Sequence, residues 1–212
     1  MRTDLLSDKA YDLLKQTLLN TGQGVFISAR QFASNHNMSY TPVREAFLRL
    51  NKEGLLDLVP NVGFFTPQIN AKDIVEIFQV RECLELFVLR KVFHLITKEH
   101  INKLVALCES QYSKLESDDV QGYMKADEAF HMVFIALYDN QHILNVYKNI
   151  REENFLCSKN IANRQSNEAI DEHQILINSI ADSDIEGAVS ALAIHIEKAK
   201  QRLREGFIRV LS

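Results

Sequence analysis

Residues 39–55 read SYTPVREAFLRLNKEGL, and this stretch decides the fold of the N-terminal third of the chain. Ser39 or Thr41 can cap a helix here, because a hydroxyl accepts hydrogen bonds from the first free N–H groups, and Pro42 suits a first helical turn. Apolar residues then recur three and four positions apart, at Val43, Ala46, Phe47 and Leu50. This spacing predicts a helix with one buried face, and Gly54 is the residue expected to end it.

Three basic side chains lie outside that apolar face: Arg44, Arg49 and Lys52. They are therefore free to meet a polyanion. The whole chain has a net charge of −4, and residues 1–66 carry seven Lys and Arg against six Asp and Glu. The overall charge is weak support for a nucleic acid partner, so the prediction of DNA binding depends on where the basic side chains lie.

The neighbouring segments complete a winged helix-turn-helix. Helices are predicted at 7–20 and 29–36, capped by Ser7 and Ser28, with a short strand at 25–27 between them. Two β-like runs at 55–59 and 63–66 follow the central helix and form a hairpin around Pro60 and Asn61. In such a fold the third helix enters the major groove of DNA, and the hairpin, or wing, contacts the backbone or minor groove.

Residues 24–66 resemble the N-terminal domain of GntR-type transcriptional regulators. The resemblance rests on Ser-x-Thr-Pro-Val-Arg-Glu-Ala-(x)2-Arg-Leu-(x)2-Glu-Gly-Leu and on the Gly-Phe-Phe wing tip at 63–65. It implies operator contacts by Arg30, Ser39, Thr41, Arg44, Arg49 and Gly63. Arginine can fork onto a guanine edge, while hydroxyl and N–H groups hold phosphates. Tyr40 joins this predicted set, at a position where the family commonly has Arg, and Asn61-Val62 replaces a basic wing residue. These two departures predict a different operator or affinity.

Everything after a short linker at 67–70 is predicted to be helical. The segments expected are 71–95, 98–117, 119–139, 141–160, 167–181 and 184–208, with a polar loop at 160–166. Glycine (7) and proline (3) are scarce, which favours long helices. The predicted fold class is therefore mainly α: a winged helix-turn-helix domain at 1–66 and an all-helical metal-binding, ligand-binding and dimerisation domain at 71–212.

Four side chains with metal-binding chemistry point toward the interior of this bundle. Asp127 and His131 are four residues apart and share one helix side, while His173 and His195 fall within or beside the apolar faces of two later helices. Burying such groups without partners is costly, and one divalent metal would satisfy all four. Imidazole and carboxylate suit Zn or Ni first, with Mn or Fe as alternatives. The alternative interpretation, in which these are structural core histidines hydrogen-bonded to the backbone or to acids such as Glu172, also stays open.

Residues 71–208 resemble the FCD ligand-binding domain that follows the winged helix in the FadR-like subgroup of GntR regulators. The matching motifs are Asp127-x-x-Phe130-His131, Glu172-His173 and Asp184-(x)3-Ala188-(x)6-His195. The resemblance implies that Asp127, His131, His173 and His195 hold a metal ion. Six predicted helices indicate the shorter, VanR-like type of FCD domain.

Arg81 is a second polar residue within an apolar helix face, and Glu85 follows one turn later. One interpretation is a half-buried Arg81–Glu85 ion pair at four-residue spacing. The other is an arginine that forks onto the carboxylate of a small acid, which also touches the metal, as the resemblance implies. Both interpretations stay open, and they do not exclude each other.

These patterns predict a metabolite-responsive repressor. It would bind double-stranded operator DNA as a homodimer and respond to a small carboxylate effector at the metal site. Three scattered cysteines (Cys83, Cys108, Cys157), expected in the core, and the lack of an apolar run of membrane-spanning length predict a cytoplasmic protein with no membrane partner. One alternative is a metal-dependent hydrolase or lyase with Glu172 as its base. Another is an adaptor protein whose histidines are structural.

Overall fold

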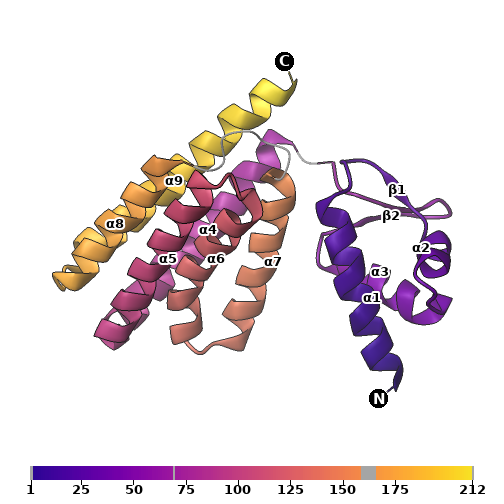
Figure 1. Ribbon diagram of the computed structural model, residues 1–212, viewed down its shortest axis with the longest axis horizontal. Coiled ribbons are helices and arrows are strands. Elements are labelled where there is room, and N and C mark those ends of the chain that lie inside the picture. Colours follow the sequence, from indigo (N-terminus) through magenta and orange to yellow (C-terminus); the bar gives the residue numbers. More distant parts are fainter. Residues whose placement is uncertain (1, 69, 159–165, 212) are drawn as a thin grey trace. The chain divides into compact units, whose positions relative to one another are not determined.

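The structure is a computed structural model that describes residues 2–68, 70–158 and 166–211 (Figure 1). The chain divides into two compact units, Met1–Asn70 and Ala71–Ser212. Each unit has its own hydrophobic core, and the two are described separately below.

The N-terminal unit is a winged helix-turn-helix, as predicted. Its elements are α1 (Arg2–Leu19), β1 (Phe26–Ile27), α2 (Ala29–Asn35), α3 (Tyr40–Lys52), β2 (Asp57–Val59) and β3 (Gly63–Phe65). The strands form an antiparallel sheet in the order β1-β3-β2, and Val59 pairs with Gly63 beside the hairpin turn. Gly63 has a φ of 142°, and a Cβ there would lie 2.5 Å from the Phe26 ring, so this position requires glycine.

Phe47 of α3 joins three elements of this unit. Its ring packs edge-on against Phe32 of α2 at 5.7 Å and against Phe64 of β3 at 5.0 Å. The other apolar α3 residues singled out from the sequence are fully buried with it. The predicted apolar face of α3 is therefore the core of the unit, which leaves the opposite face of the helix exposed.

Two helix starts differ from the expectation in detail. Helix α1 begins at Arg2, so Ser7 lies inside the helix and does not cap it. Residues 2–6 contain no glycine or proline to stop the helix, and serine is only mildly unfavourable within one. Ser39 is the N-cap residue of α3, but its side chain makes no capping hydrogen bond. Ser28 caps α2 as predicted, accepting from the Gln31 N–H.

The C-terminal unit is an all-helical bundle, with six α-helices among its described residues. They are α4 (Ala71–Val92), α5 (Lys98–Glu116), α6 (Val120–Leu137), α7 (Gln141–Ser158), α8 (Asn167–Ala181) and α9 (Ile185–Leu211), and a 3-10 turn, η1 (Phe93–Leu95), follows α4. The predicted helix boundaries are close to these. Residues 160–165 of the predicted polar loop lie outside the described residues.

Helices α4, α5, α6, α8 and α9 surround the interior of the bundle, because α8 packs on α9 and α5, α5 on α6, and α4 on α9 and α6 (Figure 1). Side-chain caps set several starts: Asp119, Ser166 and Asp184 each accept an N–H three residues further along. The expectation that the cysteines fill the core holds for Cys108 but is wrong for the exposed Cys83. Within the described part of the chain, no helix is both long enough and apolar enough to cross a membrane.

Candidate functional site

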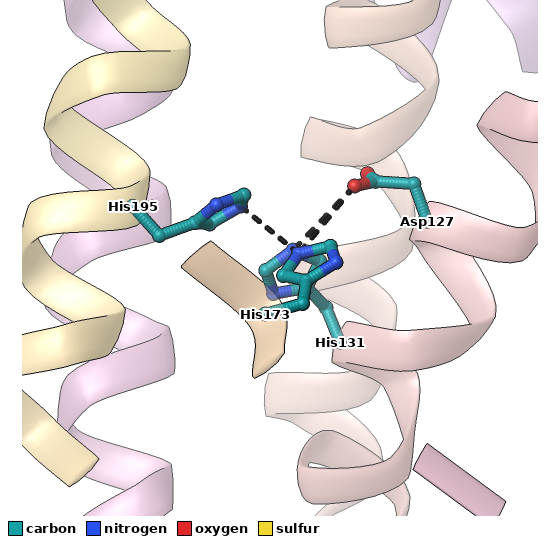
Figure 2. Close-up of side chains that lie close together, drawn as sticks. All are labelled: Asp127, His131, His173 and His195. Atoms are coloured by element: carbon teal, nitrogen blue, oxygen red, sulfur yellow. Dashed lines mark hydrogen bonds and ion pairs between the residues drawn. The ribbon is translucent and has the colours of Figure 1, made fainter. Parts of the chain in front are cut away.

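The four predicted metal ligands come together in the interior of the C-terminal unit (Figure 2). Asp127 and His131 are on α6, His173 is on α8 and His195 is on α9. One potential ligand atom from each residue lies within 4.8 Å of all the others. The three histidines are buried and the Asp127 side chain is 14% exposed. The fold thus places four separate donors around one point.

The three imidazole rings meet through their Nε2 atoms. His173 Nε2 lies 3.3 Å from His195 Nε2 and 3.4 Å from His131 Nε2. Asp127 Oδ1 lies 3.8 Å from His173 Nε2 and 3.9 Å from His131 Nε2. These distances are too long for good hydrogen bonds to the carboxylate, so Asp127 Oδ1 and the three Nε2 atoms face one another without bonding directly.

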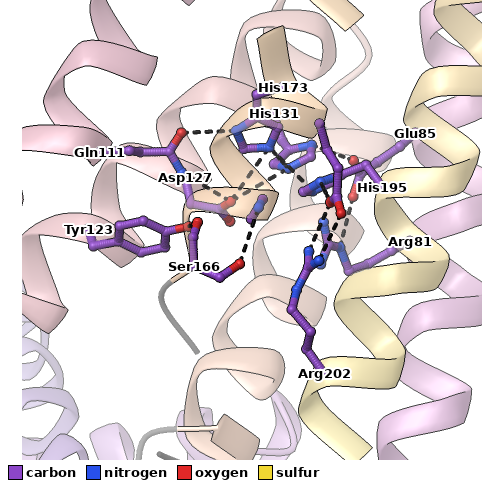
Figure 3. Close-up of polar contacts among 12 residues, drawn as sticks. Arg81, Glu85, Gln111, Tyr123, Asp127, His131, Ser166, His173, His195 and Arg202 are labelled. Carbon is purple, nitrogen blue, oxygen red and sulfur yellow. Dashed lines mark hydrogen bonds and ion pairs between the residues drawn. The ribbon is translucent and has the colours of Figure 1, made fainter. Parts of the chain in front are cut away.

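The other nitrogen of each ring faces an oxygen acceptor (Figure 3). His173 Nδ1 lies 2.9 Å from Gln111 Oε1, and His195 Nδ1 lies 2.9 Å from Glu172 Oε2. His131 Nδ1 lies 2.7 Å from Glu85 Oε2, although these two groups are not aligned as a hydrogen bond. An acceptor at Nδ1 favours the tautomer with the proton on Nδ1, so the unprotonated Nε2 atoms face one another.

The charge states of the cluster agree with this assignment. Burial lowers the pKa of His173 well below its usual value, and the neighbouring histidines add to the effect. Burial likewise lowers the pKa of His195. For Asp127 burial alone would raise the pKa, but Arg151 and the histidines outweigh it and hold the pKa well below its usual range. Two neutral imidazoles and a carboxylate are therefore present at neutral pH.

This donor set fits a divalent metal ion. Three imidazole nitrogens and one carboxylate oxygen are the ligands that Zn²⁺ and similar metals take in proteins. Oriented Nδ1–H groups that donate to carboxylate or amide oxygens are typical of metal-binding histidines. Without a cation, converging Nε2 lone pairs only repel, so the chemistry of the cluster favours an ion at its centre.

A cavity of about 60 Å³ lies beside the cluster. Its wall includes Asp127 and His195, together with Arg81, Tyr123 and Arg202. A water needs about 10–15 Å³ on the same measure, so the space suits a few water-sized groups or one small organic molecule. A group bound in this cavity would lie next to the metal-binding side chains.

Arg81 forms the ion pair that the sequence suggested, with its Nε 2.9 Å from Glu85 Oε1. The expectation of half burial was wrong, because both side chains are only 3% exposed in the bundle core. Arg81 Nη2 is buried without a hydrogen-bond acceptor in the described structure. An unsatisfied buried donor is costly, so this N–H is suited to an anion in the cavity.

Sequence reasoning missed Glu85 and Gln111 as partners of His131 and His173, and it missed Arg151 and Arg202. Arg151 Nη2 lies 2.5 Å from Asp127 Oδ2, and this leaves Oδ1 to face the histidines. The signal available for Arg151 was a polar face on α7, where Tyr147, Arg151 and Asn154 are spaced four and three apart and all are buried.

The predicted DNA-binding residues lie on and beside the exposed face of α3. Ser39, Tyr40, Thr41 and Arg44 are exposed. Arg30 of α2 is also exposed, and its guanidinium lies 5.8 Å from the centre of the Tyr40 ring. Gly63 is at the wing, where its packing against Phe26 gives it a structural role in addition to any contact with DNA.

Arg49 differs from these residues because it already has partners. Its Nη1 lies 3.1 Å from Asp8 Oδ1, its Nε lies 3.2 Å from Glu53 Oε1, and its guanidinium lies 3.9 Å from the centre of the Tyr11 ring. These contacts join α3 to α1. In the DNA-free chain Arg49 therefore has a structural role that its position on the helix did not indicate.

Taken together, the fold and the cluster define a class of protein: a winged helix-turn-helix unit followed by a helical unit with a buried histidine and aspartate centre. Comparison with known proteins specifies it further. The FCD domain family model matches residues 76–198. This match covers more than half of the chain, which therefore belongs to the FCD domain family.

Similar proteins agree with this assignment. The HTH-type transcriptional regulator YdhC of Bacillus subtilis is 24% identical over 92% of each chain. The gluconate operon transcriptional repressor of the same species is 23% identical, over 86% of this chain and 77% of the relative. These relatives are named as transcriptional regulators rather than enzymes.

Two solved structures share the fold. E. coli McbR/YncC aligns with a TM-score of 0.81 and 21% identity, over 95% of this chain and 98% of its own. The Zn²⁺-bound FCD domain of TM0439 aligns with a TM-score of 0.53 and 22% identity, over 66% of this chain and 97% of its own. The helical unit is thus a known fold, in one case described with bound Zn²⁺.

Proposed function

We propose that this protein is a DNA-binding transcriptional repressor whose operator affinity is controlled by a small carboxylate bound at a metal site in its C-terminal domain. The observation that carries the proposal is the convergence of three histidine Nε2 atoms and Asp127 beside a cavity with an unsatisfied Arg81 donor. A winged helix-turn-helix in the same chain supplies a module that such a site can regulate.

The DNA contact is assigned to the domain at 1–66. The exposed face of α3 carries Arg44 beside Thr41, and Arg30 lies next to Tyr40. Arginine on a recognition helix can read guanine in the major groove, while hydroxyls hold phosphates. One recognition helix gives too little contact for tight specific binding, so we assign a homodimer on a pseudo-palindromic operator, with the domain at 71–212 providing the dimer contact.

The metal is assigned to Asp127, His131, His173 and His195. Zn or Ni suits this donor set best, and Mn or Fe is also compatible. The Zn²⁺-bound form of the related TM0439 domain supports this assignment. A metal ion bound there supplies a positive charge that can attract an anion, while Glu85, Gln111 and Glu172 hold the three rings in place.

The effector is assigned to the cavity beside these residues. Arg81 is part of the cavity wall and has a buried Nη2 without an acceptor in the described structure, and a carboxylate is the group that an arginine fork binds best. The Arg81–Glu85 pair does not prevent this, because the pair uses Nε and leaves Nη2 available. Effector binding would change operator affinity if the two states of the protein hold the anion differently.

An enzyme is less well supported. Glu172 was the candidate base, but it accepts from both Nη atoms of Arg202 at 2.8 and 2.9 Å and lies 2.9 Å from His195 Nδ1. Burial would raise its pKa, yet these partners lower the pKa to about 2. A carboxylate held this way is a poor proton acceptor at neutral pH.

The experiment that tests the proposal is selection of bound duplexes from a random DNA pool by the full-length protein, once with added Zn²⁺ and once in EDTA. We expect enrichment of a sequence with two related half-sites, at a spacing of one helical turn or a multiple of it. The variant Arg44→Ala should enrich this sequence much less strongly, whereas Lys9→Ala, which removes an exposed basic residue on α1, should behave like the native chain. No enrichment by the native chain in either condition would overturn the proposal.

A further inference from the structure

The arginines and carboxylates around the metal-binding cluster balance one another, while Lys198, at 3.6 Å from Glu172, is a more exposed additional cation. Each of three arginines pairs with one carboxylate: Arg81 with Glu85 at 2.9 Å, Arg151 with Asp127 at 2.5 Å, and Arg202 with Glu172 at 2.8 Å. Histidine binds a metal ion as a neutral imidazole, so the three rings between these pairs add no charge of their own. The charges of the paired groups therefore cancel before the charge of a metal ion is added.

A divalent cation would disturb this balance. It brings two positive charges into a site whose histidines are almost completely buried. The cost of an uncompensated buried charge is high, and it falls when an anion of opposite charge is placed beside it. A dianion compensates both charges, a monoanion compensates one, and a neutral molecule compensates none. Electrostatics therefore favours an anion with two charges.

The cavity offers two arginines to such an anion, from different helices. Arg81 of α4 is buried, and its Nη2 has no acceptor in the described structure. Arg202 of α9 is 23% exposed and lines the cavity, and Glu172 accepts hydrogen bonds from both of its Nη atoms. Tyr123 and Asn154 complete the polar wall. At about 60 Å³ the space admits a short molecule with a charge at each end.

The same two arginines are linked to two of the metal-binding histidines (Figure 3). Arg81 holds Glu85, whose other oxygen lies 2.7 Å from His131 Nδ1. Arg202 holds Glu172, which lies 2.9 Å from His195 Nδ1. An anion that approaches either arginine changes how firmly the carboxylate holds its histidine. Anion binding and metal binding are therefore linked through contacts as well as through charge.

We propose that the cavity binds a small dianion, such as a dicarboxylate, jointly with the divalent cation, and that Arg202 selects the second negative charge. This inference rests on the metal site of the proposed function. Linkage requires the coupling to be reciprocal: the dianion tightens metal binding by the same factor by which the metal tightens dianion binding. The chemical class of the effector then follows from the charge of the site.

The test measures the affinity of the full-length protein for Zn²⁺ with free Zn²⁺ fixed by a metal buffer and ionic strength held constant. Three series of compounds with matching chain lengths are added. The dicarboxylates are malonate, succinate and glutarate, and the matched monocarboxylates are propionate, butyrate and valerate. The diamides of the three diacids form the neutral series. At least one dicarboxylate should tighten Zn²⁺ binding about tenfold or more, the matched monocarboxylate clearly less, and the diamide not at all. Titration of that dicarboxylate with and without Zn²⁺ should give the same factor.

Variants distinguish a specific role of Arg202 from a general effect of positive charge near the site. Arg202→Gln should still bind Zn²⁺ but lose the advantage of the dicarboxylate over the matched monocarboxylate, and Arg202→Lys should keep part of it. Lys198→Gln is the matched control, because Lys198 Nζ lies 3.6 Å from Glu172 and is 54% exposed, and the described cavity wall does not include it. This control should keep the full advantage.

The outcomes distinguish the two proposals. If none of the three dicarboxylates changes the affinity for Zn²⁺, or if the monocarboxylates raise it equally, the proposal of a dianionic ligand is overturned. The proposed metal site is unaffected by that result. An unchanged dicarboxylate advantage in Arg202→Gln overturns the role of Arg202. Failure of the native chain to bind Zn²⁺ overturns the metal site of the proposed function itself.

Discussion

The Nε2 atoms of His173 and His195 lie 3.3 Å apart in the buried core of the C-terminal unit. Their Nδ1 atoms meet Gln111 and Glu172 oxygens at 2.9 Å, and burial lowers the pKa of both rings. Two unprotonated nitrogens at this distance repel each other unless a positive charge lies beside them. The stability of the unit should therefore depend on a bound cation.

Removing divalent metal with EDTA is expected to lower the melting temperature, and adding Zn²⁺ should restore it. A ligand at a hundred times its Kd stabilises the native state by about 2.7 kcal/mol, which for a chain of this length is a shift of about 5–10 °C. Thermal unfolding with and without EDTA measures it. His195→Asn should lose the shift, while the exposed-site control His36→Asn should keep it. An identical melting temperature in all conditions, with no stoichiometric metal in the protein, would contradict the assignment.

Glu172 is expected to support metal binding without touching the ion. Replacing Glu172 with Gln weakens the contact to His195 Nδ1 and leaves Arg202 without its carboxylate. Loss of such a partner lowers metal affinity by about 10–100-fold in other sites. Competition with a chromogenic chelator measures the change. Glu168→Gln, one turn earlier on the exposed side of α8, provides the comparison, and equal affinities for the two variants would exclude the supporting role.

Acid should destabilise the metal-free protein in a defined pH window. Because the pKa values of His173 and His195 in the folded chain lie below the ordinary histidine value of 6.5, the unfolded chain binds more protons than the native chain as the pH falls below 6.5. Each histidine then reduces the free energy of unfolding by up to about 1.4 kcal/mol per pH unit. Glu172 acts in the same direction at lower pH, where its stabilising effect is lost between 4.5 and about 2. Urea unfolding in EDTA at pH 7.5 and 5.5 gives the values, and equal free energies would argue against neutral buried histidines.

Substitution of Arg44 is expected to affect DNA binding, whereas substitution of Arg49 is expected to affect the stability of the N-terminal unit. Arg44→Ala should reduce operator affinity by about 1–3 kcal/mol, or roughly 5–150-fold, without changing the melting temperature. Arg49→Ala removes contacts to Asp8, Glu53 and Tyr11, and it should lower the free energy of unfolding by about 1 kcal/mol. Gel shifts on a selected duplex and urea unfolding measure the two effects. A loss of stability in Arg44→Ala, or none in Arg49→Ala, would reverse these roles.

Local patterns predicted most of the fold because each helix carries its own apolar period. The apolar face of α3 and the helix boundaries of the bundle needed no tertiary information. The start of α1 could not be predicted in this way, because Ser7 has the chemistry of a cap but no residue before it breaks the helix. Caps are signals only where the preceding residues cannot continue the helix.

The candidate site was predictable only in part. The helix period shows that His131, His173 and His195 point inward, but it does not show which helices are neighbours. The family resemblance supplied that grouping. Glu85 and Gln111, which face the histidine Nδ1 atoms, come from α4 and α5, and their pairing with α6 and α8 is purely tertiary. Such partners have no sequence spacing that would reveal them.

A metal ion shared by Asp127, His131, His173 and His195 is tested most directly by anomalous diffraction at the zinc edge, from crystals of the full chain grown with Zn²⁺. The expected result is one strong peak about 2.0–2.2 Å from the three Nε2 atoms and one Asp127 oxygen. No peak between these side chains, or a zinc ion held by other residues, would contradict the assignment.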